Sequence, residues 1–407
     1  MSIASGWGRG VRAFARRDRT PTVDTSTALT PSARHPLRAV LHGLRRDGFF
    51  LILLAGLVLL SVIAPGRIAS YPTLVDWPTI AALTGLLVLT KGLEISGSMH
   101  RLGHWLIGLM ATERATALCL VMAAALLSTV LTNDVALFVV VLLTLGLCLI
   151  TKMPATRLIV FEALAVNAGS ALTPIGNPQN LFLWQLSKVS FAEFVMHMLP
   201  LVALLMVALL VLTACVFGNR PIQLSGEQKR APLDRTLLGV SLALYLPFLI
   251  ATDMRHSGWA VLVVLLVFLV LRRRVLACVD WGLLLVFVLM FIDLRLLADL
   301  SLVRDGMHAL GLEQPKHLYW VGIAASQIIS NVPAAIALAE YSTDWQVIAY
   351  GVNVGGFGFM VGSMANLIAL RMAGDRKAWL SFHGYAIPFL GIATALGYAL
   401  LFRGHAP

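Results

Sequence analysis

The sequence predicts an all-α polytopic membrane protein, built from inverted repeats with two re-entrant hairpins and two broken helices. Three observations predict it: the composition, a repeated pattern of helix-breaking residues, and the distribution of positive charge. Of the 407 residues, 58% are hydrophobic and 13% are charged. A water-soluble protein could not bury so many uninterrupted apolar runs, because no helix face would remain for water. The composition therefore predicts a chain whose main partner is the lipid bilayer.

Residues 1–47 differ in composition from the rest of the chain. They contain nine arginines and a Ser/Thr/Pro-rich run at 20–32. Such a segment is predicted to be a disordered, basic cytoplasmic tail that lies on the anionic leaflet. A transit peptide is an alternative, since such peptides are also rich in arginine and poor in acidic residues. A start codon assigned too far upstream is another, and none of these alters the membrane core.

Apolar segments that are long enough to cross a bilayer follow the tail. We expect nine spans, at residues 49–65, 77–97, 158–187, 196–218, 236–252, 257–271, 281–299, 345–370 and 381–402. Two further apolar stretches, at about 115–150 and 318–342, are predicted to turn back on themselves at Asn133 and Asn331.

The positive charges test this map. Nine crossings place the N-terminus in the cytoplasm and the C-terminus outside. Of the 31 Lys and Arg residues, 23 then lie inside, six lie outside and two lie within spans. This bias agrees with the positive-inside rule and predicts a multi-pass inner (plasma) membrane protein. It also accounts for most of the net charge of +11, so we expect no nucleic-acid partner.

Two distant segments repeat one pattern of residues. Each has an asparagine, a glycine nine residues later, and a second asparagine followed by leucine thirteen residues after the first. The positions are Asn167, Gly176 and Asn180 in the first segment and Asn353, Gly362 and Asn366 in the second. At average residue frequencies such a match arises by chance about once in 10⁴–10⁵ trials. Paired Gly/Pro-interrupted apolar segments are the best sequence indication of a transporter's binding site.

The map also predicts how the two copies are related. Residues 48–218 form the first unit, residues 219–256 a connecting loop and linking helix, and residues 257–402 the second unit. The single linking span makes the second unit enter the membrane from the opposite side, as inverted repeats do. Glu94 and Asp293 lie 39 and 38 residues before the two hairpin asparagines, which we interpret as a further correspondence.

Broken helices at membrane depth must line protein or a water-filled cavity. The hairpin tips and the breaks, at about 169–178 and 355–364, are expected to meet near the midplane. Freed carbonyls and side-chain oxygens suit Na⁺, whereas half-helix N-termini suit an anion. A single buried Asn or Ser is more often an interhelical hydrogen-bond partner, but the paired placement favours a binding role. The candidate substrate- or ion-binding residues are Thr132, Asn133, Asp134, Gly169, Ser170, Thr173, Gly176, Asn177, Asn180, Ser330, Asn331, Asn353, Gly362, Ser363 and Asn366.

The runs Thr-Asn-Asp-Val-Ala, Gly-Ser-Ala-Leu-Thr-Pro-Ile-Gly-Asn-Pro-Gln-Asn, Ser-Asn-Val-Pro-Ala and Gly-Ser-Met-Ala-Asn-Leu-Ile resemble the ion transporter superfamily. That group includes divalent-anion/sodium symporters, citrate transporters, arsenite-efflux permeases and one type of sodium/proton antiporter. The resemblance covers about residues 49–402 and implies a scaffold region, a transport region with two re-entrant hairpins, and often a homodimer. Symporter tips read Ser-Asn-Thr and hold sodium beside the substrate. The tips here read Thr-Asn-Asp and Ser-Asn-Val, and they resemble the arsenite-permease and antiporter branch more closely.

The carboxylate of Asp134 limits which substrates and ions could bind at the first hairpin tip. A carboxylate beside a bound anion is repulsive in a low dielectric unless a proton or a metal ion neutralises it. Either Asp134 binds a coupling cation, or the substrate is neutral or cationic. Lys91 and Glu94 lie one helical turn apart and are expected either to pair with each other or to serve the site; Asp293 and Arg295 are expected either to pair or to line a vestibule.

The function predicted is ion-coupled secondary transport of a small ionic substrate: an inorganic or organic anion, or an arsenite-like oxyacid. A sodium/proton antiporter of the same superfamily is the alternative, and an ion channel comes after it. An enzyme is not expected, because the sequence contains no catalytic motif and no Walker A motif. No resident cofactor or metal is expected beyond a coupling or transported Na⁺ or H⁺.

Overall fold

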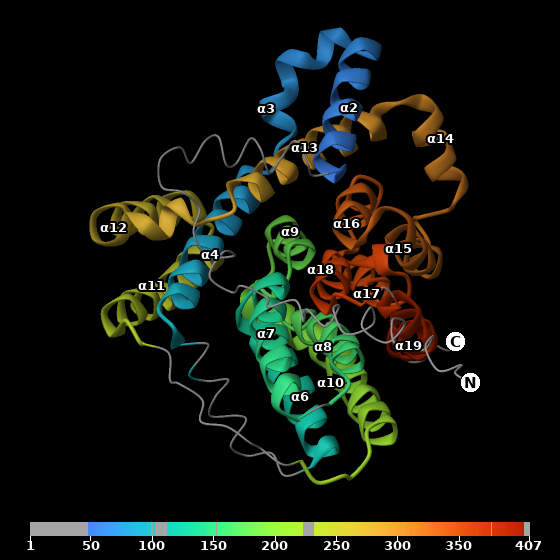
Figure 1. Cartoon of the computed structure of the whole chain (residues 1–407). Helices are drawn as coiled ribbons and strands as arrows, with labels where there is room; N and C mark the ends of the chain where they lie inside the picture. The colour runs from blue at the N-terminus through green and yellow to red at the C-terminus, as the bar shows by residue number, and fades with distance from the viewer. Residues whose placement is uncertain are drawn as a thin grey trace, which may run out of the picture.

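The computed structural model describes residues 48–98, 101, 112–151, 153–222, 232–375 and 377–402. The predicted basic tail at 1–47 lies outside the described residues. The described chain is helical, and an isolated bridge joins Thr112 to Pro221. Six of its helices are long and apolar enough to cross a membrane, or up to seven if a bent pair is one span. The prediction of an all-α polytopic membrane protein is therefore confirmed (Figure 1).

The helices follow the predicted spans closely. The first half contains α2 (Gly48–Ile63), η1 (Pro65–Ser70), α3 (Tyr71–Leu74), α4 (Trp77–Ile95), α6 (Glu113–Val130), α7 (Asn133–Thr151), α8 (Ala155–Ser170), α9 (Pro178–Ser187) and α10 (Phe191–Val216). The second half contains α11 (Arg235–Asp253), α12 (Ser257–Ala277), α13 (Trp281–Asp299), α14 (Ser301–Ala309), α15 (Pro315–Ile329), α16 (Asn331–Ala339), α17 (Trp345–Val354), η2 (Met360–Gly362), α18 (Met364–Ala373) and α19 (Ala378–Phe402). The largest difference is at α12, and there the backbone is non-helical at Arg272, one residue after the predicted end.

Aspartates begin several of these helices. The carboxylate of the capping residue accepts a hydrogen bond from a backbone N–H of the first turn, which would otherwise lack a partner. The caps are Asp76 for α4, Asp234 for α11, Asp280 for α13 and Asp344 for α17. The Leu237 N–H, with the Arg272 guanidinium, lowers the pKa of Asp234. This cap therefore keeps its charge to a lower pH than a free aspartate does.

Two of these caps belong to a repeated Val-Asp-Trp sequence, at 75–77 and 279–281. The indole Nε1 of each Trp donates to the carbonyl five residues earlier, Pro72 and Leu276, at 2.8 Å in both cases. The repeated Val-Asp-Trp sequence aligns α4 with α13, so the counterpart of Lys91 is Arg295. On this alignment Glu94 is level with Ala298 and Asp293 with Leu89, which differs from the predicted correspondence of Glu94 with Asp293.

The two halves pack alike. The arms of each hairpin, α6 with α7 and α15 with α16, contact each other and then the helix before the break, α8 or α17. The arms of the first hairpin have 18 and 19 residues, and those of the second have 15 and nine. At 1.5 Å per residue α6 is about 27 Å long, close to the hydrocarbon thickness of a bilayer. The re-entrant course of the hairpins through the membrane stays a prediction.

The helices form two groups (Figure 1). In the outer group, α4 packs against α11 and α12, while α13 packs against α2 and α3. In the central group, the hairpins and the broken helices pack together with α10 and α19. The groups meet where α4 contacts α9 and where α13 contacts α16. This arrangement resembles the division into scaffold and transport regions that the family resemblance implies.

Candidate functional site

Two of the predicted spans are interrupted where the repeated pattern lies. The helix α8 ends at Ser170 and α9 begins at Pro178, which stands in the first turn, where a missing N–H costs no bond. Asn177 caps α9 by accepting from the Asn180 N–H at 2.9 Å. In the second half the chain leaves the helix after Val354 and resumes it in α18. The predicted breaks are therefore present.

The repeated asparagines bond across the two breaks. Nδ2 of Asn167 donates to Oδ1 of Asn366 at 2.7 Å. Nδ2 of Asn353 donates to Oδ1 of Asn180, also at 2.7 Å. The first asparagine of each half therefore holds the second asparagine of the other half. All four are at most 4% exposed, so these bonds are made away from water.

A third position of each break joins the same network. Ser363 Oγ donates to Oδ1 of Asn167 at 2.9 Å, and Nδ2 of Asn177 donates to Oδ1 of Asn353 at 3.0 Å. Both donors lie ten residues after the first asparagine of their own half. The six residues Asn167, Asn177, Asn180, Asn353, Ser363 and Asn366 form what we call the asparagine core.

The asparagine core also satisfies backbone carbonyls that the breaks release from the helices. Nδ2 of Asn180 reaches the carbonyls of Ser170, Ala171 and Thr173 at 3.1–3.4 Å. Nδ2 of Asn366 donates to the Gly356 carbonyl at 2.9 Å. A broken helix at membrane depth requires such partners. The core amides therefore hold the breaks together.

Three glycines at the breaks allow backbone segments to approach each other closely. A Cβ on Gly176 would lie 2.3 Å from the Ser170 carbonyl oxygen, and a Cβ on Gly362 would lie 2.6 Å from that of Gly355. Gly169 is equally confined, since its Cβ would lie 2.2 Å from the Ala125 carbonyl oxygen in α6. None of these three has a positive φ. The reason for glycine here is therefore close approach.

The first hairpin tip is joined to the first break. The backbone N–H of Asn133 donates to the Gly176 carbonyl at 2.8 Å. Four residues before the tip asparagine, the Thr129 carbonyl accepts from Thr173 Oγ1 at 2.6 Å. The second half has a bond at the same two positions, from the Phe359 N–H to Gln327 Oε1 at 2.8 Å. Each hairpin is thus fixed to the break of its own half.

The second tip also approaches the first half. A Cβ built on Gly356 would lie 3.4 Å from Asn331 Nδ2 and 3.9 Å from Asn167 Cγ. Ser330, beside Asn331, has φ +73° and ψ 157°. That backbone region is almost confined to glycine, and a non-glycine residue there is strained. Such strain is concentrated at ligand sites and switch regions.

Unused oxygens lie at the first tip. Thr132 Oγ1 and Asp134 Oδ1 are buried and have no hydrogen-bond partner in the described part of the chain. The backbone N–H of Asp134 donates to Oδ1 of Asn133 at 3.0 Å. Hydroxyl and carboxylate oxygens are the kind of ligand that hard cations take.

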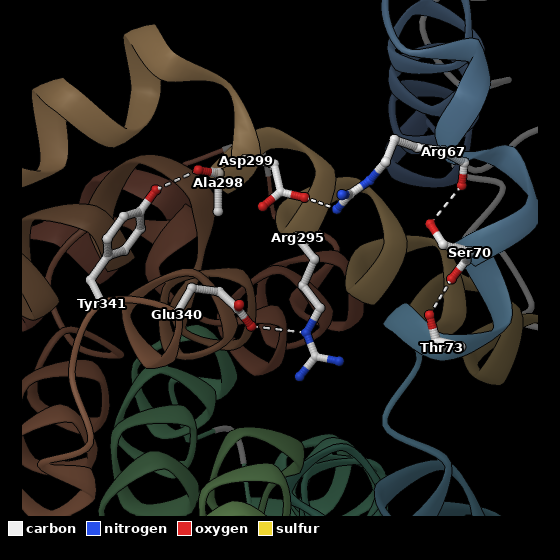
Figure 2. A network of polar contacts seen from close by, with 8 residues as sticks. All are labelled: Arg67, Ser70, Thr73, Arg295, Ala298, Asp299, Glu340 and Tyr341. Carbon is white, nitrogen blue, oxygen red and sulfur yellow. Dashed lines mark hydrogen bonds and ion pairs between the residues drawn. The ribbon is translucent and has the colours of Figure 1, made fainter.

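Of the two charged pairs considered from the sequence, one is present in the structure and the other is not. Lys91 Nζ and Glu94 Oε2 lie 2.6 Å apart, which confirms their pairing. Asp293 and Arg295 do not pair, because residues two apart on a helix do not face each other. Figure 2 shows Arg295 turned to Glu340, with its Nε 2.8 Å from Oε1, and its Nη1 donates to the Leu74 carbonyl at 2.6 Å.

A polar cluster lies around this ion pair (Figure 2). Arg67 pairs with Asp299, and the Tyr341 hydroxyl donates to the Ala298 carbonyl at 3.3 Å. A cavity of about 240 Å³ opens here, lined by Ala298, Asp299, Arg304, His308, Glu340 and Tyr341. The Arg295–Glu340 pair therefore joins α13 to the end of the second hairpin, and neither Arg295 nor Asp293 is among the residues that line the cavity.

One residue was missed by the sequence reasoning. Glu162, in the middle of α8, is 0% exposed, and its Oε1 accepts from the Thr144 hydroxyl of α7. A lone acidic residue inside an apolar span is itself a functional signal. Its counterpart in the second half is Ile348, so a search for repeated residues passed over it.

Comparison with known proteins identifies the family. Residues 37–350 match the profile of a family described as citrate transporter. The inner membrane protein YbiR of Escherichia coli (strain K12) is 46% identical over 361 residues, which cover 89% of this chain and 97% of YbiR. An uncharacterized transporter of Methanocaldococcus jannaschii is 30% identical over 351 residues, covering 85% of this chain and 95% of that protein.

A more distant match is a plant protein. The silicon efflux transporter LSI3 of Oryza sativa subsp. japonica is 32% identical over 126 residues, which cover 31% of this chain and 26% of LSI3. The family and the relatives named for an activity are transporters, which agrees with the prediction that the chain is not an enzyme. The chain belongs to the citrate transporter family and is a multi-pass membrane transporter.

Proposed function

We propose that the protein is an ion-coupled secondary transporter that moves a small oxyacid or small anion across the inner membrane by alternating access. The observation that carries the proposal is the reciprocal asparagine core, in which Asn167 binds Asn366 and Asn353 binds Asn180. Two halves that bond to each other through equivalent residues can exchange roles when the molecule changes shape. Inverted repeats supply such an exchange.

The donors around the core favour a small substrate of low charge. Among the described residues, the hydrogen bonds of the core come from amides, hydroxyls and backbone groups, and none comes from Lys or Arg. A multiply charged carboxylate such as citrate would need positive charge there. An oxyacid that is uncharged at neutral pH, as arsenite and silicic acid are, needs only hydrogen bonds. LSI3, named as a silicon efflux transporter, supports this choice.

The membrane and its orientation are proposed on similar grounds. The match to YbiR, an inner membrane protein, supports the inner membrane. The predicted charge map supports a cytoplasmic N-terminus and an external C-terminus. The homodimer and the division into units at 48–218 and 257–402 stay predictions.

Sodium/proton antiport is the second candidate. The unpartnered oxygens of Thr132 and Asp134 favour it, since they offer cation ligands to which no basic residue of the described ranges bonds. In the oxyacid transporter the same oxygens hold the coupling cation. The two functions differ in whether any solute other than Na⁺ and H⁺ moves.

Reconstitution in proteoliposomes separates these functions. The probes are radiolabelled arsenite, germanic acid as a silicic acid analogue, citrate and ²²Na⁺, each under a proton gradient or a sodium gradient. The proposed function predicts saturable movement of arsenite or germanic acid, with counterflow. Movement of ²²Na⁺ against protons alone would establish the antiporter, and unsaturable flux would establish a channel.

Asp134→Asn is expected to uncouple transport from the ion gradient. The amide keeps the size of the side chain but loses the charge that binds a cation, and the second half has Val332 at this position. Exchange of arsenite across the membrane should continue, while accumulation against a gradient should be lost. Concentrative transport by the variant, with unchanged dependence on pH and sodium, would contradict a coupling role for Asp134.

A further inference from the structure

Glu162 is buried inside the central group of helices. It lies five residues before Asn167 on α8, a rise of about 7.5 Å at 1.5 Å per residue. The side chain is 0% exposed, and so is that of its counterpart Ile348 in the second half. An aliphatic side chain therefore fills the equivalent place in the fold, and packing alone does not require a carboxyl group.

The carboxyl group is only half satisfied. Oε1 accepts from the Thr144 hydroxyl, and Oε2 is buried with no hydrogen-bond partner among the described residues. No ion pair of the described residues includes Glu162. An ionised carboxylate in the middle of a membrane helix is energetically costly unless a proton or a cation neutralises it. The group therefore needs a proton or a cation during at least part of its cycle.

The side chains around α8 bear on whether Glu162 binds a proton or a metal cation. The helices packed against α8 are α6, α7, α10, α18 and α19. Their titratable or charged residues are Glu113, Arg114, Cys119, Asp134, Cys148, Glu193, His197, Cys215, Arg371, His383, Tyr385 and Tyr398. Of these, Cys148 lies one helical turn after Thr144 on α7. Arg114 donates instead to the Phe217 carbonyl, and Arg371 is exposed.

A metal cation requires more oxygen ligands than the surroundings of Glu162 provide. Hard cations take about six oxygen ligands, whereas Glu162 has one hydroxyl beside it and lies in a run of α8 whose other residues from 158 to 166 are apolar and buried. A proton needs one oxygen and one hydrogen-bond acceptor. We infer that Glu162, together with Thr144, is a proton-binding site of the transporter, separate from the tip residues Thr132 and Asp134.

Glu162 and Thr144 can hydrogen-bond to each other whether the Glu162 carboxyl group is ionised or protonated. When Glu162 is ionised, the Thr144 O–H donates to Oε1, as the structure shows. When a proton binds, a new O–H bond converts the carboxylate to a carboxylic acid, which can donate to Thr144 Oγ. The threonine hydroxyl then turns to the carbonyl of Val140, four residues earlier, as threonines in helices often do. The proton comes from water on one side and leaves to the other, and no other covalent bond changes.

The position of the site connects it to the asparagine core. The same helix carries Glu162 and Asn167, and α18, which carries Asn366, packs against both α7 and α8. A change of charge between α7 and α8 therefore acts on the helices that bear two bonded core residues. This coupling to transport rests on the proposed function; the binding of a proton does not.

Infrared difference spectroscopy of the purified full-length protein tests the site, with the proton as the probe. We expect a carboxylic acid C=O band that titrates with pH, is absent in Glu162→Gln, and changes its midpoint in Thr144→Val but not in Thr144→Ser. A band unaltered in Glu162→Gln would overturn the inference. If Glu162→Gln does not fold, the two threonine variants decide, and an unmoved midpoint in both would also overturn it.

Proteoliposomes with a pH-sensitive dye test the link to transport. Arsenite movement by the wild-type protein should carry protons, and Glu162→Gln should exchange arsenite with the number of protons per arsenite reduced. Equal proton movement by both proteins would overturn the coupling role. If the wild-type protein moves none of the probes, the proposed function fails, and the infrared titration still decides whether Glu162 binds a proton.

Discussion

Replacing Gly176 with valine is expected to abolish transport while the protein still inserts into the membrane. A Cβ at this position would lie 2.3 Å from the Ser170 carbonyl oxygen and 2.8 Å from that of Ser128. Both atoms belong to the backbone, so neither can turn away. Overpacking of a well-packed core costs about 1–3 kcal/mol, and here the displaced atoms hold the first break against its hairpin. Arsenite counterflow and membrane yield are the two measurements.

Gly146 provides the matched control. It lies on α7 of the same hairpin, and a Cβ there would meet nothing within 4 Å. Gly146→Val should therefore transport at nearly the wild-type rate. Gly362→Val should also fail, since its Cβ would lie 2.6 Å from the Gly355 carbonyl oxygen. Wild-type counterflow by Gly176→Val would show that the close approach at the break is not needed for function.

Replacing Asn353 with alanine is expected to have the largest effect on stability. The asparagine donates to Asn180 Oδ1 and accepts from Asn177 Nδ2 and Gln179 Nε2 at 2.7, 3.0 and 3.4 Å. Hydrogen bonds between membrane helices contribute about 0.6–1.7 kcal/mol each, so losing three costs about 2–5 kcal/mol. Thermal unfolding in detergent should show the loss, and transport should fall to background. Asn219→Ala, at an exposed position, is the control.

A double-mutant cycle tests the pairing itself. Asn353→Ala and Asn180→Ala should show a coupling energy of about 0.6–1.7 kcal/mol. The cycle of Asn167→Ala with Asn366→Ala should give a similar value, because the two bonds have the same length, 2.7 Å. Additive effects in both cycles would mean that the asparagines act independently, contrary to the reciprocal arrangement.

The sequence predicted the broken helices well, and the reason is physical. Glycine, proline and asparagine inside apolar runs conflict with a continuous membrane helix, so residues such as Gly176 and Pro178 mark the break directly. The spacing from Asn167 to Asn180, repeated from Asn353, then identified equivalent positions. It could not show that each first asparagine bonds to the second asparagine of the other half, since that depends on how the halves are placed.

The charged residues were predicted less well. Lys91 and Glu94 lie three apart on one helix, where side chains do meet, so their pair was predictable. Arg295 pairs with Glu340, which is 45 residues away in the sequence, and only the fold brings them together. Glu162 could have been found, since an acidic residue in an apolar span is rare. The repeat pattern gave no reason to examine it, because Ile348 replaces it in the second half.

Counterflow in proteoliposomes tests the central claim most directly, namely that the reciprocal asparagine core is the centre of a carrier with alternating access. Vesicles are loaded with unlabelled arsenite or germanic acid, and uptake of labelled arsenite or the germanium label is followed for the wild-type protein, Gly146→Val and Asn353→Ala. We predict saturable uptake that internal substrate accelerates in the first two proteins, and background uptake in Asn353→Ala. Counterflow by Asn353→Ala at the wild-type rate, or wild-type uptake that internal substrate leaves unchanged, would contradict the claim.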